Sequence, residues 1–521
     1  MSYRAYPEPA PKPGGYDPVL DLPSNHLAWL IESTVEEALQ NKALPPQDGQ
    51  PPFDPRLCAK VLLYGYATGI RSSRLLERNC RENLPFLLLT RGDTPSYRTL
   101  CNFRIKHAEV IEEIWLQLFE VANQLGFKRL GRLVIDSSKF RADASAESVV
   151  KAQMYEALRN QLQAILKEAN EQDQKEDQHS PGTTLLDQEV KPEQMREILR
   201  RVRKEFAASK KKASPTPADT PSDPPQERPP LGPGMIPRIE AALKTIEAAE
   251  QEGLKHACLT DPDARMMGEG RDKPIKECHS FEVVVDRDAQ LLVVGQTTQE
   301  GFDHSRLEPL LLAALPLEPK GIVAADADSG YYKGEVIARL QERGIDTCIP
   351  DGSTAKSLRE GGVSSPCLPV DASSPSVALV YDGERDVFVC GAGHDLSVTQ
   401  TLMRGGRNVK IYTTKIACTG CSLASLCLHK SDAKHRTTSR AVDAMNPVDR
   451  ALSRFADPEH QERYHNRAMI VETVFGFLRH ILGYDHWMVR GKERVASEDT
   501  LFKTAYQFRK VHCAWKLASG V

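Results

Sequence analysis

The middle of the sequence contains a stretch that cannot contribute to any hydrophobic core. Residues 213–235, ASPTPADTPSDPPQERPPLGPGM, are dominated by Pro, Ser, Thr, Asp and Gly. Proline supplies no backbone N–H and restricts the residue before it, so such a stretch forms neither a helix nor a sheet. We therefore interpret it as a disordered linker, and the chain must build its folded parts from the segments on either side.

The linker lies inside a longer charged region, residues 147–255, which we predict to be a helical insertion. Its first part carries an apolar stripe at helical spacing that includes Met154, Leu158 and Leu162. A basic helix, PEQMREILRRVRKEFAASKKK, precedes the linker, and a third helix, IPRIEAALKTIEAAEQEG, follows it. These patterns predict helical arms on both sides of the linker.

Length and composition leave room for several folded domains. The chain has 521 residues, of which 40% are hydrophobic, so about two to four domains are expected. A net charge of -3 excludes a global positive field, so any contact with DNA must come from local basic clusters. The N-terminus has no apolar signal segment, and no run approaches the roughly 20 apolar residues of a membrane span. Twelve mostly scattered cysteines are typical of a reducing cytoplasm.

Residues 16–128 are predicted to form a helical domain. HLAWLIESTVEEAL has apolar residues at helical spacing after a Ser24-Asn25 cap signal, and FDPRLCAKVLLYGYATG opens with Asp-Pro and closes at Gly69. Ser96 is the predicted N-cap of a later helix. A basic cluster in this domain suits contacts with DNA phosphates, although a solvated helix face explains it equally well. The members of the cluster are Arg71, Arg74, Arg78, Arg81, Arg98, Arg104 and Lys106.

Residues 129–146 and 256–362 carry patterns of strands and helices. RLVI is a short apolar run, and we predict a strand that ends at Asp136. SFEVVVD and LLVVGQTT predict a hairpin, whereas GIVAAD predicts a strand that ends near Asp326 and Asp328, before the helix KGEVIARLQERG. Because α/β sheets place ligands at the carboxyl ends of their strands, these acids are candidates for chemistry.

The last part of the sequence returns to helix after an irregular stretch. Residues 363–445 are predicted to be irregular and rich in Cys, and residues 446–521 to be helical. Glu472 lies in the late helix YHNRAMIVETVFGFLR, on a polar stripe opposite an apolar arc. The chain has 71 acidic residues, so position alone singles out none of them. The residues of the apolar arc are Ile470, Val471, Val474, Leu478 and Ile481.

Five segments, in this order, resemble one enzyme family. They are FDPRLCAKVLLYGYATGIRSSRLLERNCREN, VIDSSKFRADAS, LTDPDARMM, DSGYYKGE and YHNRAMIVETVFGFLR. Together they resemble bacterial insertion-sequence transposases of the DDE class, in the branch whose N-terminal domain is like that of InsH. The resemblance implies a multidomain α+β or α/β fold. Its parts are a helical N-terminal DNA-binding domain, a ribonuclease H-like mixed-sheet catalytic domain, a helical insertion and a Cys-rich subdomain.

The resemblance implies that Asp136, Asp328 and Glu472 are catalytic acids that bind divalent cations. Asp328 is preferred because it directly precedes Ser-Gly-Tyr, and Asp326 is the alternative. Clustered carboxylates bind two Mg²⁺ ions about 3.5–4 Å apart, where the ions act on the attacking and leaving oxygens of a phosphoryl transfer. Mg²⁺ or Mn²⁺ is therefore the expected cofactor.

The resemblance also implies contacts with DNA phosphates. Tyr464 and Arg467 stand at the Tyr and Arg of the family signature, and Arg479 takes the place of its Lys. An Arg supplies charge and paired hydrogen bonds but is not equivalent to Lys. Four residues separate Arg467 from Glu472, where the commonest form of the signature has three. The residues of the N-terminal domain that are predicted to contact DNA are Arg71, Arg74, Arg98 and Arg104.

The implied function is DNA transposition, in which a cut at the transposon end frees a 3′-hydroxyl that attacks either target DNA or the opposite strand to form a hairpin. The expected partners are double-stranded DNA at terminal inverted repeats, target DNA and a second copy of the chain in a homodimer. The expected location is the cytoplasm, at the nucleoid, and no association with a membrane is expected. Two alternatives share the motifs: an inactive transposase-derived DNA-binding protein or repressor, and a nuclease that never joins strands. Tyr331 and Tyr332 are interpreted as packing groups rather than nucleophiles.

A group of cysteines predicts a structural zinc site. Cys418, Cys421 and Cys427 have the spacing C-x2-C-x5-C, and Cys390 lies upstream in FVCGAGH. Four cysteines on two tight turns match tetrahedral Zn²⁺ ligation. The alternative is a set of free buried thiols in a reducing cell.

Overall fold

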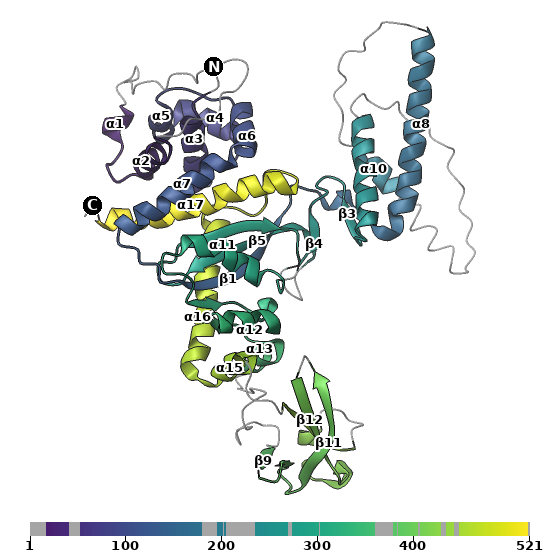
Figure 1. The fold of residues 1–521 in the computed structure, drawn as a ribbon. Coiled ribbons are helices and arrows are strands. Elements are labelled where there is room, and N and C mark those ends of the chain that lie inside the picture. Colours follow the sequence, from purple (N-terminus) through teal and green to yellow (C-terminus); the bar gives the residue numbers. More distant parts are fainter. Residues whose placement is uncertain are drawn as a thin grey trace.

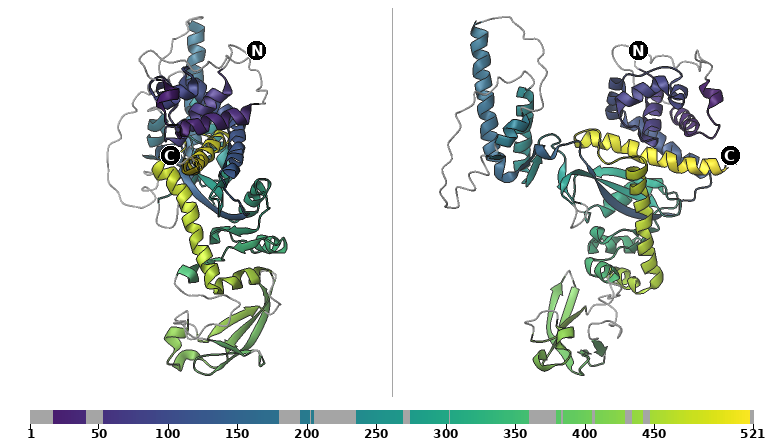
Figure 2. Two further views of the ribbon diagram at one scale, coloured as in Figure 1. Left: turned by 90° about the vertical axis from the view of Figure 1, so that its left-hand side faces the viewer. Right: turned by 180° about the vertical axis from the view of Figure 1, so that it is seen from behind.

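The computed structural model places a helical domain over a central mixed sheet, with a helical arm beside the sheet and a second, smaller sheet at the opposite end (Figure 1). Two further views show the same arrangement from the side and from behind (Figure 2). Apart from Met235, the predicted linker 213–235 lies outside the described residues. The structure describes residues 17–40, 53–179, 195–201, 203–204, 235–268, 274–301, 303–359, 379–382, 384–404, 407–428, 434–441 and 447–518.

The N-terminal domain is helical, as the apolar spacing predicts. Asp54 caps α3 and Ser96 caps α6, each through a side-chain oxygen that accepts a backbone N–H. The helix α2 begins after His26 rather than at the Ser24-Asn25 pair, because the His26 ring accepts the capping hydrogen bond. The helices are α1 (Pro18–Asp21), α2 (Leu27–Leu39), α3 (Pro55–Ala67), α4 (Ser73–Glu82), α5 (Leu84–Thr90), α6 (Tyr97–Lys106) and α7 (Ala108–Gln124).

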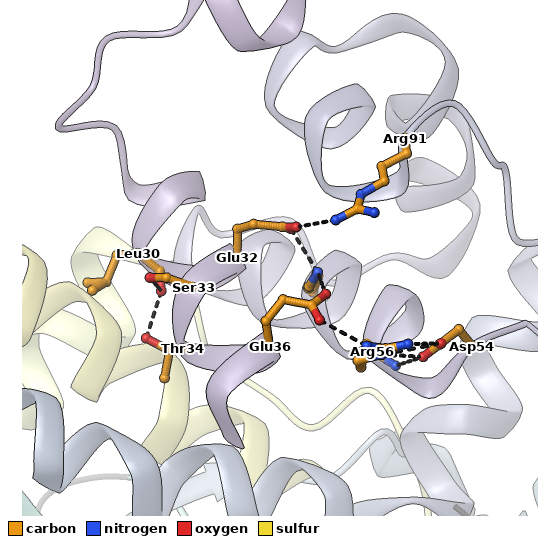
Figure 3. A network of polar contacts seen from close by, with 9 residues as sticks. Leu30, Glu32, Ser33, Thr34, Glu36, Asp54, Arg56 and Arg91 are labelled. Atoms are coloured by element: carbon orange, nitrogen blue, oxygen red, sulfur yellow. Dashed lines mark hydrogen bonds and ion pairs between the residues drawn. The ribbon is translucent and has the colours of Figure 1, made fainter. Parts of the chain in front are cut away.

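A charge network around one buried lysine joins α2, α3 and the end of α5. The Lys60 side chain on α3 is fully buried, and its ammonium pairs with Glu36 and, at 2.8 Å, with Glu32. Arg91 reaches Glu32 at 3.2 Å and Arg56 reaches Glu36 at 2.9 Å (Figure 3). A buried ammonium requires such partners, because an unpaired charge in the interior is strongly destabilising.

The central sheet is mixed and has β1 (Arg132–Arg141) in its middle. β5 (Lys276–Asp286) pairs with β1 in antiparallel orientation and forms the predicted hairpin with β6 (Leu292–Thr298). On the other side, β7 (Ala324–Asp326) pairs with β1 in parallel orientation, and β8 (Asp346–Cys348) pairs with β7. β4 (Arg265–Met267) also pairs with β5.

The strand β1 is longer than its apolar run predicts. It continues past Asp136 to Arg141, because each of these later residues pairs with β5, from Ser137 opposite Glu282 to Arg141 opposite Cys278. The hydrogen-bond ladder holds polar residues in the strand that apolar patterning alone does not indicate. Asp136 therefore lies in the middle of its strand and not at its carboxyl end.

The two faces of the sheet pack against different helices. On one face, α17 (Lys492–Ala518) lies between the sheet and the N-terminal helices, and Phe140, Phe281 and Phe502 belong to a hydrophobic core that continues into α2, α3 and α7. The opposite face packs against α11 (Leu307–Ala314), α12 (Gly334–Glu342) and α15 (Pro447–Ser453). The N-terminal domain and the sheet thus share one continuous core.

The insertion forms an arm with a core of its own, as predicted. β2 (Val149–Lys151) and β3 (His256–Cys258) pair at its base, and α8 (Tyr155–His179) and α10 (Met235–Gln251) extend from it (Figure 1). The buried side chains include Leu158 and Leu162 on α8 and Ile239 on α10. Residues 195–201 of the predicted basic helix are also helical.

The region predicted to be irregular, residues 363–445, instead contains an antiparallel sheet. Its order is β13-β12-β11-β10-β9. The strands are rich in Thr and other polar residues and bury few side chains, so they lack the apolar alternation by which strands are recognised. The strands are β9 (Val380–Asp382), β10 (Val387–Val389), β11 (Asp395–Arg404), β12 (Arg407–Thr414) and β13 (Thr437–Ala441), and the short helices α13 (Gly352–Arg359) and α14 (Ala424–Cys427) lie before and within this region.

The helix that carries Glu472 is α16 (Pro458–Gly476), which continues into a π-helical turn at Phe477–Ile481. Val471 and Val474 are buried and Glu472 is exposed, as the helical pattern predicts. Ile481 is 65% exposed and leaves the predicted apolar arc, because the wider turn changes the direction of its side chain. Among the described residues, no helix combines the length and the apolar character of a membrane span.

Candidate active site

The fold brings Asp136 and Asp328 together. In the parallel pair β1 and β7, Val134 stands opposite Asp326, and the two predicted ligands each lie two residues further along their segments. Asp328 caps the short turn that follows β7 by accepting the Gly330 N–H at 2.8 Å, which fixes its carboxylate at the end of the strand. Asp136 accepts the Ser137 N–H at 2.8 Å.

The electrostatics of Asp136 confirm this proximity. Burial and the charges of Asp328 and Asp303 together raise the pKa of Asp136 to about 7, whereas the charge of Arg467 opposes the shift. Carboxylates that share a small volume repel one another, so one of them holds a proton unless a cation compensates. Concentrated negative charge of this kind, made of oxygen donors alone, fits a hard divalent cation such as Mg²⁺.

The neighbouring acid Asp326 is committed to other partners. Its side chain is 3% exposed and binds the guanidinium of Arg463, with Nε–O distances of 3.0 and 3.1 Å, and that of Arg287 at 3.4 Å. Arg463 also reaches Asp346 at 2.5 Å, so it links α16 to the ends of β7 and β8. Asp326 thus serves in an ion-pair network, which favours Asp328 as the strand-end acid of the site.

Glu472 does not form a cluster with Asp136 and Asp328. It lies on the exposed side of α16, whose Val471 and Val474 belong to the core that also contains Val134 and Phe140 of β1. In the part of the chain that the structure describes, no group of three or more His, Cys, Asp or Glu side chains is close enough to hold a metal ion. The structure therefore brings together two of the three predicted acids.

Arg467, which belongs to α16, lies near Asp136 and Asp328. Its guanidinium is 5.0 Å from the centre of the Tyr464 ring and opposes the raised pKa of Asp136. Nε and Nη1 of Arg467 are buried, and neither atom has a hydrogen-bond partner among the described residues. A buried guanidinium with unused donors is suited to an incoming phosphate oxygen.

Arg479 is anchored to the strand that carries Asp136. Its Nη2 donates to the Lys139 carbonyl at 2.8 Å, and its guanidinium lies 4.9 Å from the centre of the Phe140 ring. The side chain is half-buried. Part of its role is thus to hold α16 and its π-helical turn against β1.

The basic residues of the N-terminal domain divide into two classes. Arg71 and Arg104 are 7% and 5% exposed, and both bind backbone carbonyl groups: Arg71 that of His486 at 2.5 Å, and Arg104 that of Arg71 at 2.7 Å. Their donors stabilise the junction between the helices and the segment after α16, so Arg71 and Arg104 offer little exposed surface for the predicted contact with DNA. The burial of an Arg with carbonyl partners cannot be read from charge patterning.

Arg74 and Arg98 remain at the surface. They lie 5.1 and 5.8 Å from the centre of the Tyr97 ring, and the hydrogen bond from Arg98 lowers the pKa of that phenol. This exposed cluster of two cations and one aromatic ring has the composition of a contact surface for a nucleic-acid backbone.

The segment LTDPDARMM has a structural role. Asp261 is fully buried, binds His279 at 2.9 Å and accepts the Gly491 N–H at 3.1 Å. Burial alone would raise the pKa of Asp261, but the His279 contact holds it below its ordinary value. Asp263 accepts the Lys492 N–H at 2.8 Å, so the segment fastens the start of α17 to the sheet.

Tyr331 and Tyr332 are packing groups, as interpreted from the sequence. Tyr331 is fully buried in the core on the α11 side of the sheet, and Tyr332 packs against the same core. Sequence reasoning missed Asp303, which lies between β6 and α11 and raises the pKa of Asp136. The sequence indicates Asp303 only by its position between a predicted strand and a predicted helix, and many acidic residues at the surface occupy such positions.

The four cysteines predicted to bind zinc line one pocket. Cys390, Cys418, Cys421 and Cys427 are free thiols, and His394 lies in the same lining. Burial raises the pKa of Cys427, and the other three cysteines add to the shift, which places all four near one another. The His and Cys side chains described here do not form a group with metal-binding geometry, so a zinc site remains a prediction.

Comparison with known families finds two matches. Residues 20–106 match the family model "Transposase domain (DUF772)", which covers most of the N-terminal helices. Residues 389–512 match the model "Transposase DDE domain", which includes Glu472 and most of α17. Neither match includes Asp136 or Asp328. No curated protein and no solved structure matches the chain.

Proposed function

Because this chain belongs to the DDE transposases of insertion sequences, we propose that it binds the DNA ends of such an element, cuts them and joins them to target DNA. The observation that carries the proposal is the convergence of Asp136 and Asp328 from neighbouring parallel strands. The charge of Asp328 raises the proton affinity of Asp136, and two carboxylates so placed provide the negative charge that a divalent cation neutralises.

We propose Asp136, Asp328 and Glu472 as the acids that hold Mg²⁺ or Mn²⁺. Divalent ions at such a site stabilise the attacking and leaving oxygens during phosphoryl transfer. Asp136 and Asp328 hold fixed positions on the sheet, and Glu472 presents an exposed carboxylate from α16. A mixed sheet with the first acid on its central strand supports a ribonuclease H-like catalytic domain.

DNA is proposed to contact two surfaces. Near the acids, the unused donors of Arg467 and the adjacent Tyr464 suit a phosphate group, and Arg479 adds positive charge. On the N-terminal domain, Arg74, Arg98 and the Tyr97 ring between them suit the backbone of the transposon end. We further propose a homodimer on paired ends and a structural zinc ion at the cysteine pocket.

The test is an assay on labelled transposon-end DNA, for which inverted repeats flanking the gene supply the sequence. We expect wild type to nick the ends and to join them to target DNA in Mg²⁺ or Mn²⁺. Asp136→Asn and Asp328→Asn should cut about a thousandfold more slowly, since removing a ligand of the catalytic cation costs several kcal/mol of barrier. Asp288→Asn is the control, because Asp288 pairs with Arg132 at the far end of β1.

The outcomes separate the alternatives. Ends that are bound but never nicked identify a repressor-like protein without activity. Ends that are nicked but never joined identify a nuclease. If Asp136→Asn cuts as fast as wild type, the proposed site is wrong.

A further inference from the structure

Asp303 lies in the segment between β6 and α11 and is tied to the strand of Asp136. Its Oδ1 accepts the Ser137 hydroxyl at 3.1 Å, and the Lys139 ammonium lies 3.7 Å from the same oxygen. Ser137 is the residue directly after Asp136, and its backbone N–H donates to the Asp136 carboxylate. One residue therefore connects Asp303 to the first acid of the candidate active site.

Asp303 also converges on Asp328. A Cβ atom placed on Gly330 would lie 2.9 Å from Asp328 Oδ1 and 3.4 Å from Asp303 Oδ2. The two carboxylates thus lie on the same side of the Gly330 backbone, where the missing side chain of the glycine leaves space beside both. Asp303 comes from a third segment of the fold, so its presence here does not follow from the β1–β7 register.

A buried hydroxyl provides an independent sign that this space takes a ligand. Tyr331 is 0% exposed, and its hydroxyl has no hydrogen-bond partner among the described residues. The hydroxyl lies near the Ser137 side chain, although not in hydrogen-bonding geometry with it, and within electrostatic range of both Asp303 and Asp136. A buried O–H without a partner is costly, and a bound water next to the acids would satisfy it.

We propose that Asp303 is a fourth acid of the candidate active site and increases its affinity for a divalent cation. The inference rests on the proposed function, since it assumes that Asp136 and Asp328 hold the cation. Mg²⁺ and Mn²⁺ sites commonly retain several waters, and a carboxylate outside the direct ligands accepts hydrogen bonds from them. Asp303 acts in this way, and the Tyr331 hydroxyl bonds to the same water layer.

The test measures Mn²⁺ binding to the full-length protein without DNA, by electron paramagnetic resonance of free Mn²⁺. We expect Asp303→Asn to weaken Mn²⁺ binding about tenfold, which is the lower end of the effect of outer partners on metal affinity. Asp136→Asn should weaken it more. Asp288→Asn, which removes a paired acid at the far end of β1, should leave the affinity within about twofold of wild type.

Two results overturn the proposal in different ways. If Asp303→Asn binds Mn²⁺ like wild type while Asp136→Asn and Asp328→Asn bind weakly, Asp303 is outside the site and the proposed function stands. If none of the three variants weakens binding, the proposed cation site itself is wrong. Should Asp303→Asn fail to fold, Ser137→Ala decides, because it removes the hydrogen bond that holds Asp303 and keeps every charge. We expect about threefold weaker binding in that variant, and unchanged binding refutes the proposal.

Discussion

Residues of the same type have different roles in this protein, and the role of each depends on its burial and its partners. Arg71 and Arg74 are three positions apart, yet one donates to backbone carbonyl groups in the interior and the other stands at the surface beside Tyr97. Asp326 and Asp328 are two positions apart, yet one is bound by arginines and the other faces a second aspartate. The chemistry of each residue follows from its partners rather than from its type.

Substitution of the surface arginines should weaken DNA binding without loss of stability. Arg74→Ala and Arg98→Ala each remove one phosphate-seeking cation, so the affinity for transposon-end DNA should fall and the slope of log affinity against log salt should decrease by about 1. Fluorescence anisotropy at several salt concentrations measures both quantities. Arg78→Ala is the matched control, since Arg78 is paired with Glu82. An unchanged slope in Arg74→Ala and Arg98→Ala contradicts a phosphate contact at these residues.

Glu318 should make stability depend on pH. Glu318 is 5% exposed, and burial together with the charge of Asp286 raises its pKa to about 7. The folded state therefore binds the proton more tightly than the unfolded state, and stability falls as pH rises from the ordinary value of Glu towards 7. Glu318→Gln removes this dependence, so its free energy of unfolding relative to wild type should increase by about 2 kcal/mol between pH 5 and pH 8. Urea unfolding at the two pH values measures the difference, and a constant difference contradicts the assignment.

At the scale of elements, apolar periodicity predicted the N-terminal helices, the β5–β6 hairpin and α12, because each buries one regular face. It underestimated β1, whose second half is held by pairing with β5 rather than by its own apolar residues. It missed β9 to β13, where polar strands bury few side chains. Resemblance to a family indicated Asp136, Asp328 and Glu472, but the β1–β7 register and the approach of Asp303 depend on tertiary contacts that one sequence does not display.

The charge network on α2 and α3 should be essential to the N-terminal helices. Lys60→Ala leaves Glu32 and Glu36 without their shared buried cation, although Arg91 and Arg56 remain. We expect a loss of about 3 kcal/mol in the free energy of unfolding. Arg78→Ala, which removes an exposed ion pair on α4, should cost less than about 1 kcal/mol. Equal losses in the two variants would show that the buried network contributes no more than a surface pair.

At the scale of the whole molecule, α17 joins the N-terminal helices and the central sheet in one hydrophobic core. Its Phe502 packs in the core that also contains Tyr66 of α3 and Phe281 of β5. The arm built on α8 and α10 and the sheet β9 to β13 have cores of their own. We therefore expect the N-terminal helices to keep a fixed position relative to Asp136.

Weakening the junction should destabilise both parts together. Arg71→Ala removes the hydrogen bonds to the carbonyl groups of Gly483 and His486, and we expect a loss of about 2 kcal/mol. Hydrogen exchange should report the loss in α3 and in β1 alike. If α3 alone loses protection, the two parts unfold independently and the shared core does not couple them.

The central claim is that Asp136 and Asp328 hold the cation that cuts DNA, and a metal-rescue assay tests it most directly. Asp136→Cys and Asp328→Cys replace an oxygen ligand with a softer thiolate, which suits Mn²⁺ better than Mg²⁺. Both variants should fail to nick transposon-end DNA in Mg²⁺ and should regain at least about a tenth of the wild-type rate in Mn²⁺. Equal inactivity in both metals, or rescue of Asp326→Cys instead of Asp328→Cys, would contradict the account.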